Sequence, residues 1–138
     1  MGIKQISVFL ENTTGRLCEV TQTLAKAGIN LRAISIADTA DFGILRLIVD
    51  KTDEAVNVLG AAGFTTRQTT VAAVEIDDKP GSLAALMELF RTSGINIEYL
   101  YASLEGGTSK AVVIFKLEDY ENGFEILKKN GITMAEKF

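Results

Sequence analysis

The stretch NTTGRL at residues 12–17 is followed by GINL at residues 28–31, and the chain then repeats both patterns as DKPGSL at 78–83 and GINI at 94–97. Each later stretch stands 66 positions after its counterpart. A loop, an interval of helix length and a glycine–asparagine turn in one register predict two copies of one small unit. Anything built where the copies meet is then built twice, so we expect function at their junction.

The composition is typical of a soluble globular protein. Apolar residues make up 47% of the chain and charged residues 23%, which is too apolar for a disordered segment. The longest apolar runs, such as residues 111–115, fall far short of the ~20 residues of a membrane helix, and no signal-peptide pattern opens the chain. We therefore expect a cytoplasmic protein that binds no membrane.

The charge pattern argues against nucleic acid as a partner. The net charge is -4, and no run of Lys or Arg is present. Binding to a phosphate backbone depends on such basic clusters. The sequence therefore predicts no direct contact with nucleic acid.

The first copy begins with a strand and an amphipathic helix. Residues 3–11 are rich in β-branched and aromatic side chains and lead into a polar turn. Leu17, Val20 and Leu24 fall on one face of a helix. Gly28 is placed to end this helix with a positive φ.

Two more strands and a second helix complete the first copy. We expect the strands at about 31–37 and 44–50, joined by a turn at 38–43. The second helix should start with Thr52 or Asp53 as its cap. The order is therefore strand, helix, strand, strand, helix.

The second copy repeats this order with different side chains. After a strand at 71–77, Pro80 suits the first turn of a helix that buries Leu83 and Leu86 and ends at Gly94. Two strands, at 97–103 and 109–117, and a helix that ends at Gly131 follow.

The two copies follow each other without a linker. Residues 64–77 contain no Gly or Pro and are dense in Thr and Val, so the last strand of one copy should run almost directly into the first strand of the next. We predict an α+β chain of two ferredoxin-like βαββαβ domains, residues 1–70 and 71–138, side by side with their helices on one face.

These motifs together resemble the ACT domain, a small-molecule regulatory module of amino-acid metabolism. The resemblance lies in a loop of form [Asn/Asp]-x-[Pro/Thr]-Gly-x-Leu before the first helix and in Gly-Ile-Asn-[Leu/Ile] before the second strand, and it covers nearly the whole chain twice. It implies an eight-stranded antiparallel sheet made by two domains, a free amino acid bound at their seam, and no cofactor. The chain thus looks like a stand-alone tandem regulatory protein.

The first helix of each copy also provides a place for a carboxylate. The backbone N–H groups of residues 14–17 and 80–83 would face an anion at the positive end of the helix dipole. Asparagine and aspartate oxygens could accept hydrogen bonds from an ammonium group. We therefore expect a ligand with both groups, as in an amino acid.

The resemblance also suggests how residues pair across the seam. In the serine-binding ACT domains of phosphoglycerate dehydrogenases, an Asn of the first loop and the Gly-x-Asn residue of the neighbouring domain hold the ligand, which pairs Asn12 with Asn96 and Asp78 with Asn30. The full set of candidate ligand-binding residues is Glu11, Asn12, Thr14, Gly15, Arg16, Leu17, Asn30, Leu31, Asp38, Asp78, Pro80, Gly81, Ser82, Leu83, Asn96 and Ile97.

Two departures separate this chain from the serine-binding members. Those members carry a histidine two residues before the loop Asn, where this chain has Leu10 and Ile76. Asp78 also places a negative charge beside a carboxylate ligand, whereas Asn12 does not. We therefore predict unequal sites, with the better one at Asn12.

Several of these features also fit a purely structural role. Asn30 and Asn96 could be simple turn residues, and Arg16 could be a solvated residue of the first helical turn. Tyr99 and Tyr101 share one sheet face, which would be exposed opposite the helices and could join two chains in a homodimer.

The sequence favours a binding protein over an enzyme. It has no histidine and a single cysteine, Cys18, which excludes His-based triads and Cys/His zinc clusters. We expect Cys18 to be a reduced thiol packed near a core. The alternative function is a regulatory subunit of an amino-acid biosynthetic enzyme, similar to the small subunit of acetolactate synthase, that acts by protein contact.

Overall fold

The computed structural model describes residues 2–38, 41–104 and 109–136, apart from the side chain of Asp38. The chain divides into two compact units. We call Lys4–Thr69 the first repeat and Thr70–Phe138, together with Met1–Ile3, the second repeat. The predicted domain boundary between residues 70 and 71 falls inside a strand that continues from one unit into the other.

The observed elements follow the predicted order in both repeats. The first repeat contains β1 (Ile3–Glu11), α1 (Arg16–Lys26), β2 (Leu31–Asp38), β3 (Phe42–Val49), α2 (Thr52–Ala61) and the beginning of β4 (Thr65–Asp77). The second contains the rest of β4, α3 (Ser82–Thr92), β5 (Ile97–Ala102), β6 (Lys110–Leu117) and α4 (Tyr120–Lys129). The helices α1 and α3 start 66 residues apart, and α2 and α4 start 68 apart.

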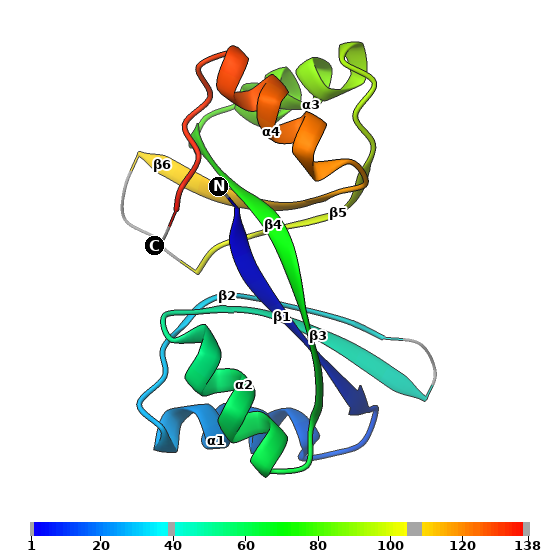
Figure 1. Cartoon of the computed structure of the whole chain (residues 1–138), viewed down its shortest axis with the longest axis vertical. Helices are drawn as coiled ribbons and strands as arrows, with labels where there is room; N and C mark the ends of the chain where they lie inside the picture. Colours follow the sequence, from blue (N-terminus) through cyan, green and yellow to red (C-terminus); the bar gives the residue numbers. More distant parts are fainter. Residues whose placement is uncertain (1, 39–40, 105–108, 137–138) are drawn as a thin grey trace. The chain divides into compact units, whose positions relative to one another are not determined.

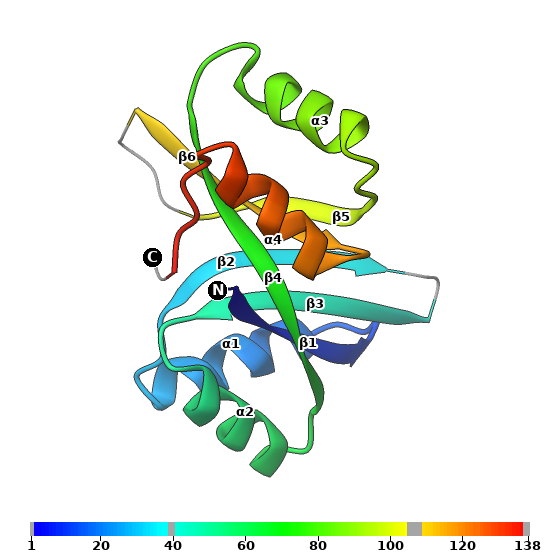
Figure 2. The ribbon, with the colours of Figure 1, turned by 45° about the horizontal axis from the view of Figure 1, so that its top comes forward.

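Each repeat places its helices on one face of antiparallel strands. The strand order is β2-β3-β1 in the first repeat and β4-β6-β5 in the second. The helices α1 and α2 lie on one side of the first set of strands, and α3 and α4 lie on one side of the second (Figures 1 and 2). The predicted α+β class with ferredoxin-like topology is confirmed.

The strand count differs from the eight that the resemblance implies, because the structure describes six. The last strand of the first copy and the first strand of the second are a single 13-residue strand, β4. After α4, the described residues up to 136 form an isolated bridge between Val74 and Met134, beside a hydrogen bond from Ala135 N to Ala73 O of 2.8 Å. A Thr- and Val-rich segment without Gly or Pro has nothing to interrupt it, so it continues as one strand.

The first repeat has its own hydrophobic core. Alternate residues of β1 point toward the helices, so Ile6, Val8 and Leu10 are buried, and they pack with Val20 and Leu24 of α1. All five side chains are at most 2% exposed.

The second repeat buries an equivalent set on its own strands and helices. Val74 of β4 packs with Leu86 and Phe90 of α3 and with Phe115 of β6. The rings of Phe90 and Phe115 meet edge to face with centroids 5.6 Å apart, an arrangement worth ~0.5–1.5 kcal/mol beyond the buried area. Each repeat therefore has its own hydrophobic core.

Three side chains expected near a core lie at the surface. Leu17 and Leu83 are 39% and 37% exposed, because the first turn of each helix stands beyond the buried stripe that begins at Val20 and Leu86. Cys18 is exposed as well. It lies two residues before Val20, and two residues turn a helix by about 200°, which directs the thiol away from the core.

The starts of the helices also differ from the sequence predictions. Pro80 lies before α3, whose N-cap is Gly81, and not in its first turn. The N-cap of α2 is Lys51, with no side-chain cap, in place of Thr52 or Asp53. In α4 the cap is Asp119, whose carboxylate accepts a hydrogen bond from Asn122 N at 3.1 Å.

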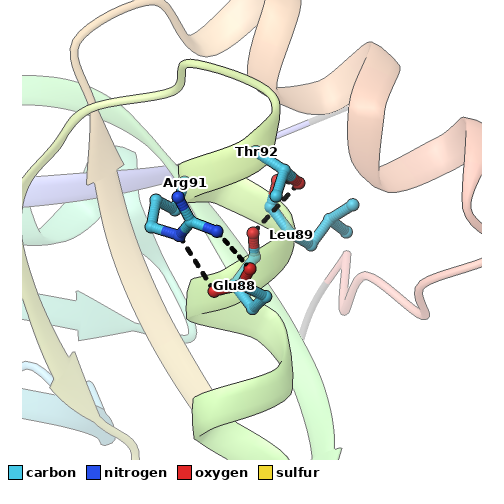
Figure 3. Close-up of polar contacts among 4 residues, drawn as sticks. All are labelled: Glu88, Leu89, Arg91 and Thr92. Carbon is cyan, nitrogen blue, oxygen red and sulfur yellow. Dashed lines mark hydrogen bonds and ion pairs between the residues drawn. The ribbon is translucent and has the colours of Figure 1, made fainter.

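The C-terminal turn of α3 is held by side chains that come from consecutive turns (Figure 3). Arg91 donates to the Glu88 carboxylate through Nε at 3.0 Å and through a terminal nitrogen at 2.5 Å. The hydroxyl of Thr92 donates to the carbonyl oxygens of Glu88 and Leu89. The Thr92 bonds add a side-chain donor near the helix end, where the Leu89 carbonyl oxygen also accepts a hydrogen bond from Ser93 N at 3.1 Å.

No helix within the described ranges is long and apolar enough to cross a membrane.

Replacing Gly15 with alanine should destabilise the protein by about 1–2 kcal/mol. Gly15 has φ 91°, and an added Cβ would meet no atom within 4 Å, so the cost is that of the left-handed backbone alone. Gly60→Ala is the matched control, because Gly60 lies in a helix and also has open space around it. That change should stabilise by about 0.5–1 kcal/mol. Urea unfolding measures both, and equal effects would contradict the explanation.

Candidate functional site

The loops before α1 and α3 have the same backbone hydrogen bonds. In the first repeat Asn12 N donates to Asp41 O at 2.9 Å, and Glu19 N donates to Gly15 O at 3.0 Å. In the second repeat the equivalent bonds run from Asp78 N to Ser109 O and from Ala85 N to Gly81 O, both 2.9 Å long. The two loops are therefore one backbone structure that carries two sets of side chains.

A glycine with positive φ turns the chain into the helix in each loop. Gly15 has φ 91° and Gly81 has φ 92°, values that an L side chain rarely adopts. Both glycines are the N-caps of their helices. Since no side-chain cap bond is present at either N-cap, the first helical turn keeps backbone donors for another partner.

Fewer backbone N–H groups are available at the start of each helix than the sequence predicts. Arg16 N already donates to Thr13 O at 3.4 Å, and Ser82 N donates to Lys79 O at 3.3 Å. Pro80 has no N–H. In the part of the chain that the structure describes, the N–H groups of Leu17 and Leu83 have no backbone acceptor, and they remain the best placed to meet an anion.

Arg16 is held inside the first repeat. Its guanidinium carbon lies 4.6 Å from the centroid of the Phe64 ring, and one terminal nitrogen is 2.6 Å from a Glu19 oxygen. Its Nε lies 3.5 Å from a Glu11 oxygen, and the side chain is 25% exposed. A cation with two carboxylates and a ring face around it fixes the loop to the body of the repeat.

The second repeat uses a different ion pair at the same place. Asp77 accepts a hydrogen bond from Lys110, and Lys79 Nζ lies 3.9 Å from the same carboxylate. The hydrogen bond and the charge of Lys110 lower the pKa of Asp77, and Asp77 in turn raises the pKa of Lys110. The charge on Asp77 is therefore balanced within the repeat.

Each loop borders a hollow in its own repeat. The hollow of the first repeat has a volume of about 340 Å³ and is lined by Leu10, Glu11, Asn12, Thr13, Arg16, Leu17, Ile36 and Gly43. The hollow of the second has a volume of about 620 Å³ and is lined by Glu75, Ile76, Asp77, Lys79, Pro80, Gly81, Ser82, Ala85, Leu86, Leu89, Lys110, Gly131, Ile132 and Thr133. The second volume lies in the range of small-molecule sites, and the first lies at its lower end.

Within each repeat, the loop and the Gly-x-Asn residue lie at opposite ends of the sheet. Asn30 is far from the loop before α1, and Asn96 is far from the loop before α3. Asn30 precedes β2, whose first residue pairs with Val49 at the end of β3, whereas Glu11 pairs with Phe42 at its start. Within one repeat, therefore, the loop and the Gly-x-Asn residue cannot share a small ligand. A joint site requires one of each from different repeats or different chains, so the predicted pairs stay predictions.

Both asparagines have local partners. Asn30 N donates to the Asp50 carboxylate at 2.9 Å, and its carbonyl oxygen accepts a hydrogen bond from Asp50 N at 3.2 Å. The Asn96 side chain donates to the Glu118 carboxylate at 2.9 Å. Both of these hydrogen bonds of Asn30 are made by its backbone and not by its side-chain amide.

The sequence-predicted residues thus fall into four groups. Those that line a hollow are Glu11, Asn12, Arg16 and Leu17 in the first repeat and Pro80, Gly81 and Ser82 in the second. Thr14, Gly15, Asp78 and Leu83 belong to the loops or first turns but line neither hollow, and Leu31 and Ile97 open β2 and β5 beside the asparagines. Asp38 ends β2, and its side chain lies outside the described part.

Other lining residues were missed by sequence reasoning. Ile36 and Gly43 reach the first hollow from β2 and β3, and Lys110 and Ile132 reach the second from β6 and the segment after α4. A motif search around the loop finds none of them. The available signal is a comparison of the copies, which pairs Ile132 with Phe64 at the offset of 68.

The ring of Tyr101 is buried, whereas the sequence predicted that it would be exposed. Tyr101 is 8% exposed and Tyr99 is only partly buried, so the chain itself covers Tyr101.

No group of three or more His, Cys, Asp or Glu residues that could hold a metal ion occurs in residues 2–38, 41–104 and 109–136.

Two ferredoxin-like units with glycine-cornered loops define a duplicated small domain, and comparison with known proteins gives its family. The model of the ACT domain pair matches residues 1–137, so the chain belongs to the ACT domain family. None of the curated protein sequences compared with the chain matches it.

Solved structures with the same fold span nearly the whole chain. A protein from Bacteroides thetaiotaomicron is 38% identical, with 98% of this chain and 92% of that one covered and a TM-score of 0.92. The regulatory subunit of aspartate kinase from Thermus thermophilus, in its ligand-free form, is 20% identical, with 94% and 93% covered and a TM-score of 0.69. The regulatory subunit from Thermus flavus is 18% identical, with 94% and 92% covered and a TM-score of 0.64. The last two likenesses concern the fold.

A double-mutant cycle on Arg16 and Phe64 should give a coupling of about 0.5–1 kcal/mol, because the guanidinium lies over the ring face. The variants are Arg16→Ala, Phe64→Leu and the double change, measured by urea unfolding. The cycle of Arg91→Ala with Phe64→Leu is the control, because Arg91 pairs with Glu88 on α3. Additive effects in the first cycle would contradict the contact.

Replacing Asp77 with asparagine should lower stability only where both partners are charged. The pKa of Asp77 lies below its ordinary value of 3.8, and the pKa of Lys110 lies above its ordinary value of 10.5. The carboxylate's contribution is present above pH 3.8 and is lost as pH falls through the lowered pKa. The ammonium's contribution is present below pH 10.5 and is lost as pH rises through the raised pKa. Urea unfolding at several pH values tests this window, and a difference that persists well below the lowered pKa would contradict it.

Proposed function

We propose that this ACT domain pair is a non-catalytic regulatory protein of the cytoplasm that binds a free amino acid. The observation that carries the proposal is the loop of the first repeat, where Asn12 and Glu11 line a hollow next to the N-terminus of α1. This helix N-terminus has no side-chain cap. The absence of histidine from the sequence agrees with a binding role.

The chemistry of the first loop suits an α-amino acid. The N–H group of Leu17 at the positive end of α1 would receive the carboxylate. The Asn12 side-chain oxygen and the half-exposed Glu11 carboxylate would accept from the ammonium group. Arg16 is engaged with Glu11 and Glu19, so its part is to position the loop. The apolar side of the hollow, at Leu10, Leu17 and Ile36, would receive the ligand's side chain.

The Gly-x-Asn residue of a neighbouring domain would complete the binding site. We propose Asn12 with Asn96 as the better site and Asp78 with Asn30 as the weaker one, with 1–70 and 71–138 as the two domains. Binding would favour one packing of domains or of two chains in a homodimer, and a partner enzyme of amino-acid metabolism would respond to that population shift.

The alternative is a regulatory subunit, similar to the acetolactate synthase small subunit, that acts by protein contact without an effector. The observation in its favour is a pair of exposed apolar side chains on one face of the strands of the first repeat, Phe9 and Phe42, which are 42% and 61% exposed. Exposed apolar groups of this size are typical of protein contacts when they gather in a patch.

A thermal-shift screen against the twenty amino acids separates the two functions. One or a few amino acids should stabilise the protein, by about 2.7 kcal/mol at a concentration 100 times Kd. Asn12→Ala and Asn96→Ala should each abolish the shift, whereas Asn30→Ala should leave most of it.

Asn57→Ala is the control for the loss of an exposed amide, because Asn57 lies on the outer face of α2. It should leave the shift unchanged. No response to any of the twenty amino acids would refute the sensor function and leave the contact function.

A further inference from the structure

The two repeats differ most where the same backbone carries different side chains beside the first helix. Alignment of the copies pairs Arg16 with Ser82 and Glu19 with Ala85 at the offset of 66. It pairs Phe64 with Ile132 at the offset of 68. All three residues of the first repeat are larger than their counterparts.

In the first repeat Arg16 contacts both of the other side chains. The Arg16 guanidinium lies between the Phe64 ring, at 4.6 Å from its centroid, and the Glu19 carboxylate, at 2.6 Å. Arg16 therefore bridges the start of α1 and the segment that follows α2. We call Arg16, Glu19 and Phe64 the plug.

In the second repeat the corresponding space is open. Ser82, Ala85 and Ile132 all line the hollow of about 620 Å³, between the start of α3 and the segment that follows α4. Because the loop hydrogen bonds are the same in both repeats, we attribute the hollow to the shorter side chains.

The hollow has an apolar side and a polar side. Leu86, Leu89 and Ile132 form part of the apolar wall. On the polar side, Lys110 is bonded to Asp77, whereas Lys79 stands 3.9 Å from that carboxylate and is the more loosely held cation. Ser82 adds a hydroxyl.

This pattern selects one charge on the ligand. The Asp77 carboxylate already faces two lysines. Glu75, the other carboxylate that lines the hollow, acts on Lys110 and adds to the effect of Asp77 in raising its pKa, so an ammonium group would gain little there. A carboxylate, in contrast, would find Lys79 and the Ser82 hydroxyl near the positive end of α3. We propose that the hollow of the second repeat is a separate binding site for a small monocarboxylate that has an apolar body and no ammonium group.

This site is separate from the better of the two proposed amino-acid sites, that of Asn12 with Asn96. It lies within one repeat, and Ala85, Leu89 and Ile132 take no part in the proposed contacts of Asn12 with Asn96. The loss of either activity therefore leaves the other measurable.

The test uses 4-methylpentanoate, with leucine and 4-methylpentanol as matched probes that add an ammonium group or remove the carboxylate. Titration of the full chain followed by amide NMR should show saturable shifts in α3 and in residues 131–133. Leucine and the alcohol should bind there at least tenfold more weakly. No saturable shift with 4-methylpentanoate, or equal binding of all three, would overturn the proposal.

Transfer of the plug is the decisive variant. The triple change Ser82→Arg, Ala85→Glu and Ile132→Phe rebuilds the side chains of the first repeat on the equivalent backbone, and it should abolish 4-methylpentanoate binding. Lys79→Gln should weaken binding at least fivefold without filling the hollow, so it tests the site even if the triple variant does not fold. Asn12→Ala should leave the affinity unchanged. Retention of binding in a folded triple variant, or in Lys79→Gln at wild-type affinity, would refute the assignment.

Discussion

The turn from strand to helix at Gly15 and Gly81 is the constraint on which the rest of each repeat depends. A positive φ at these glycines ends the strand and directs the first helix back over the sheet. The hydrogen bonds of Asn12 N and Asp78 N tie the same loop to the residue just before β3 or β6. Helix, loop and hairpin are thus set relative to one another by a few backbone contacts, and side chains are left to vary.

That division between backbone and side chains explains how duplication produced different surfaces. The loop geometry is shared, whereas the residues that follow the glycine are not: a clamped arginine in the first repeat and a serine in the second. Because Arg16 is held by Glu11, Glu19 and Phe64, it fills the space next to its helix. In the second repeat, Lys110 pairs with the Asp77 carboxylate. The equivalent space beside α3 stays open.

Much of the fold could be predicted from the sequence, because short-range signals carry it. The alternation of apolar residues in β1 and the 66-residue offset predict strands, helices and duplication within a residue or two. The failures have a tertiary cause. Leu17 has the spacing of a core residue, yet its turn extends beyond the buried stripe, and β4 runs on as one strand where two were counted. Of the candidate site, the loop residues could be found, but not Ile36, Lys110 or Ile132, which come from distant segments.

The sequence by itself determined the duplicated order of strand, helix, strand, strand and helix, the two glycine turns and the residues that differ between the copies, since these depend on local propensity and on spacing along the chain. Only the tertiary structure decided which of those residues act together. It showed Arg16 over the ring of Phe64, 48 residues away, and the second hollow bounded by Ser82 and Ile132. Contacts between segments so far apart depend on how helices pack on a sheet, and no local pattern records them.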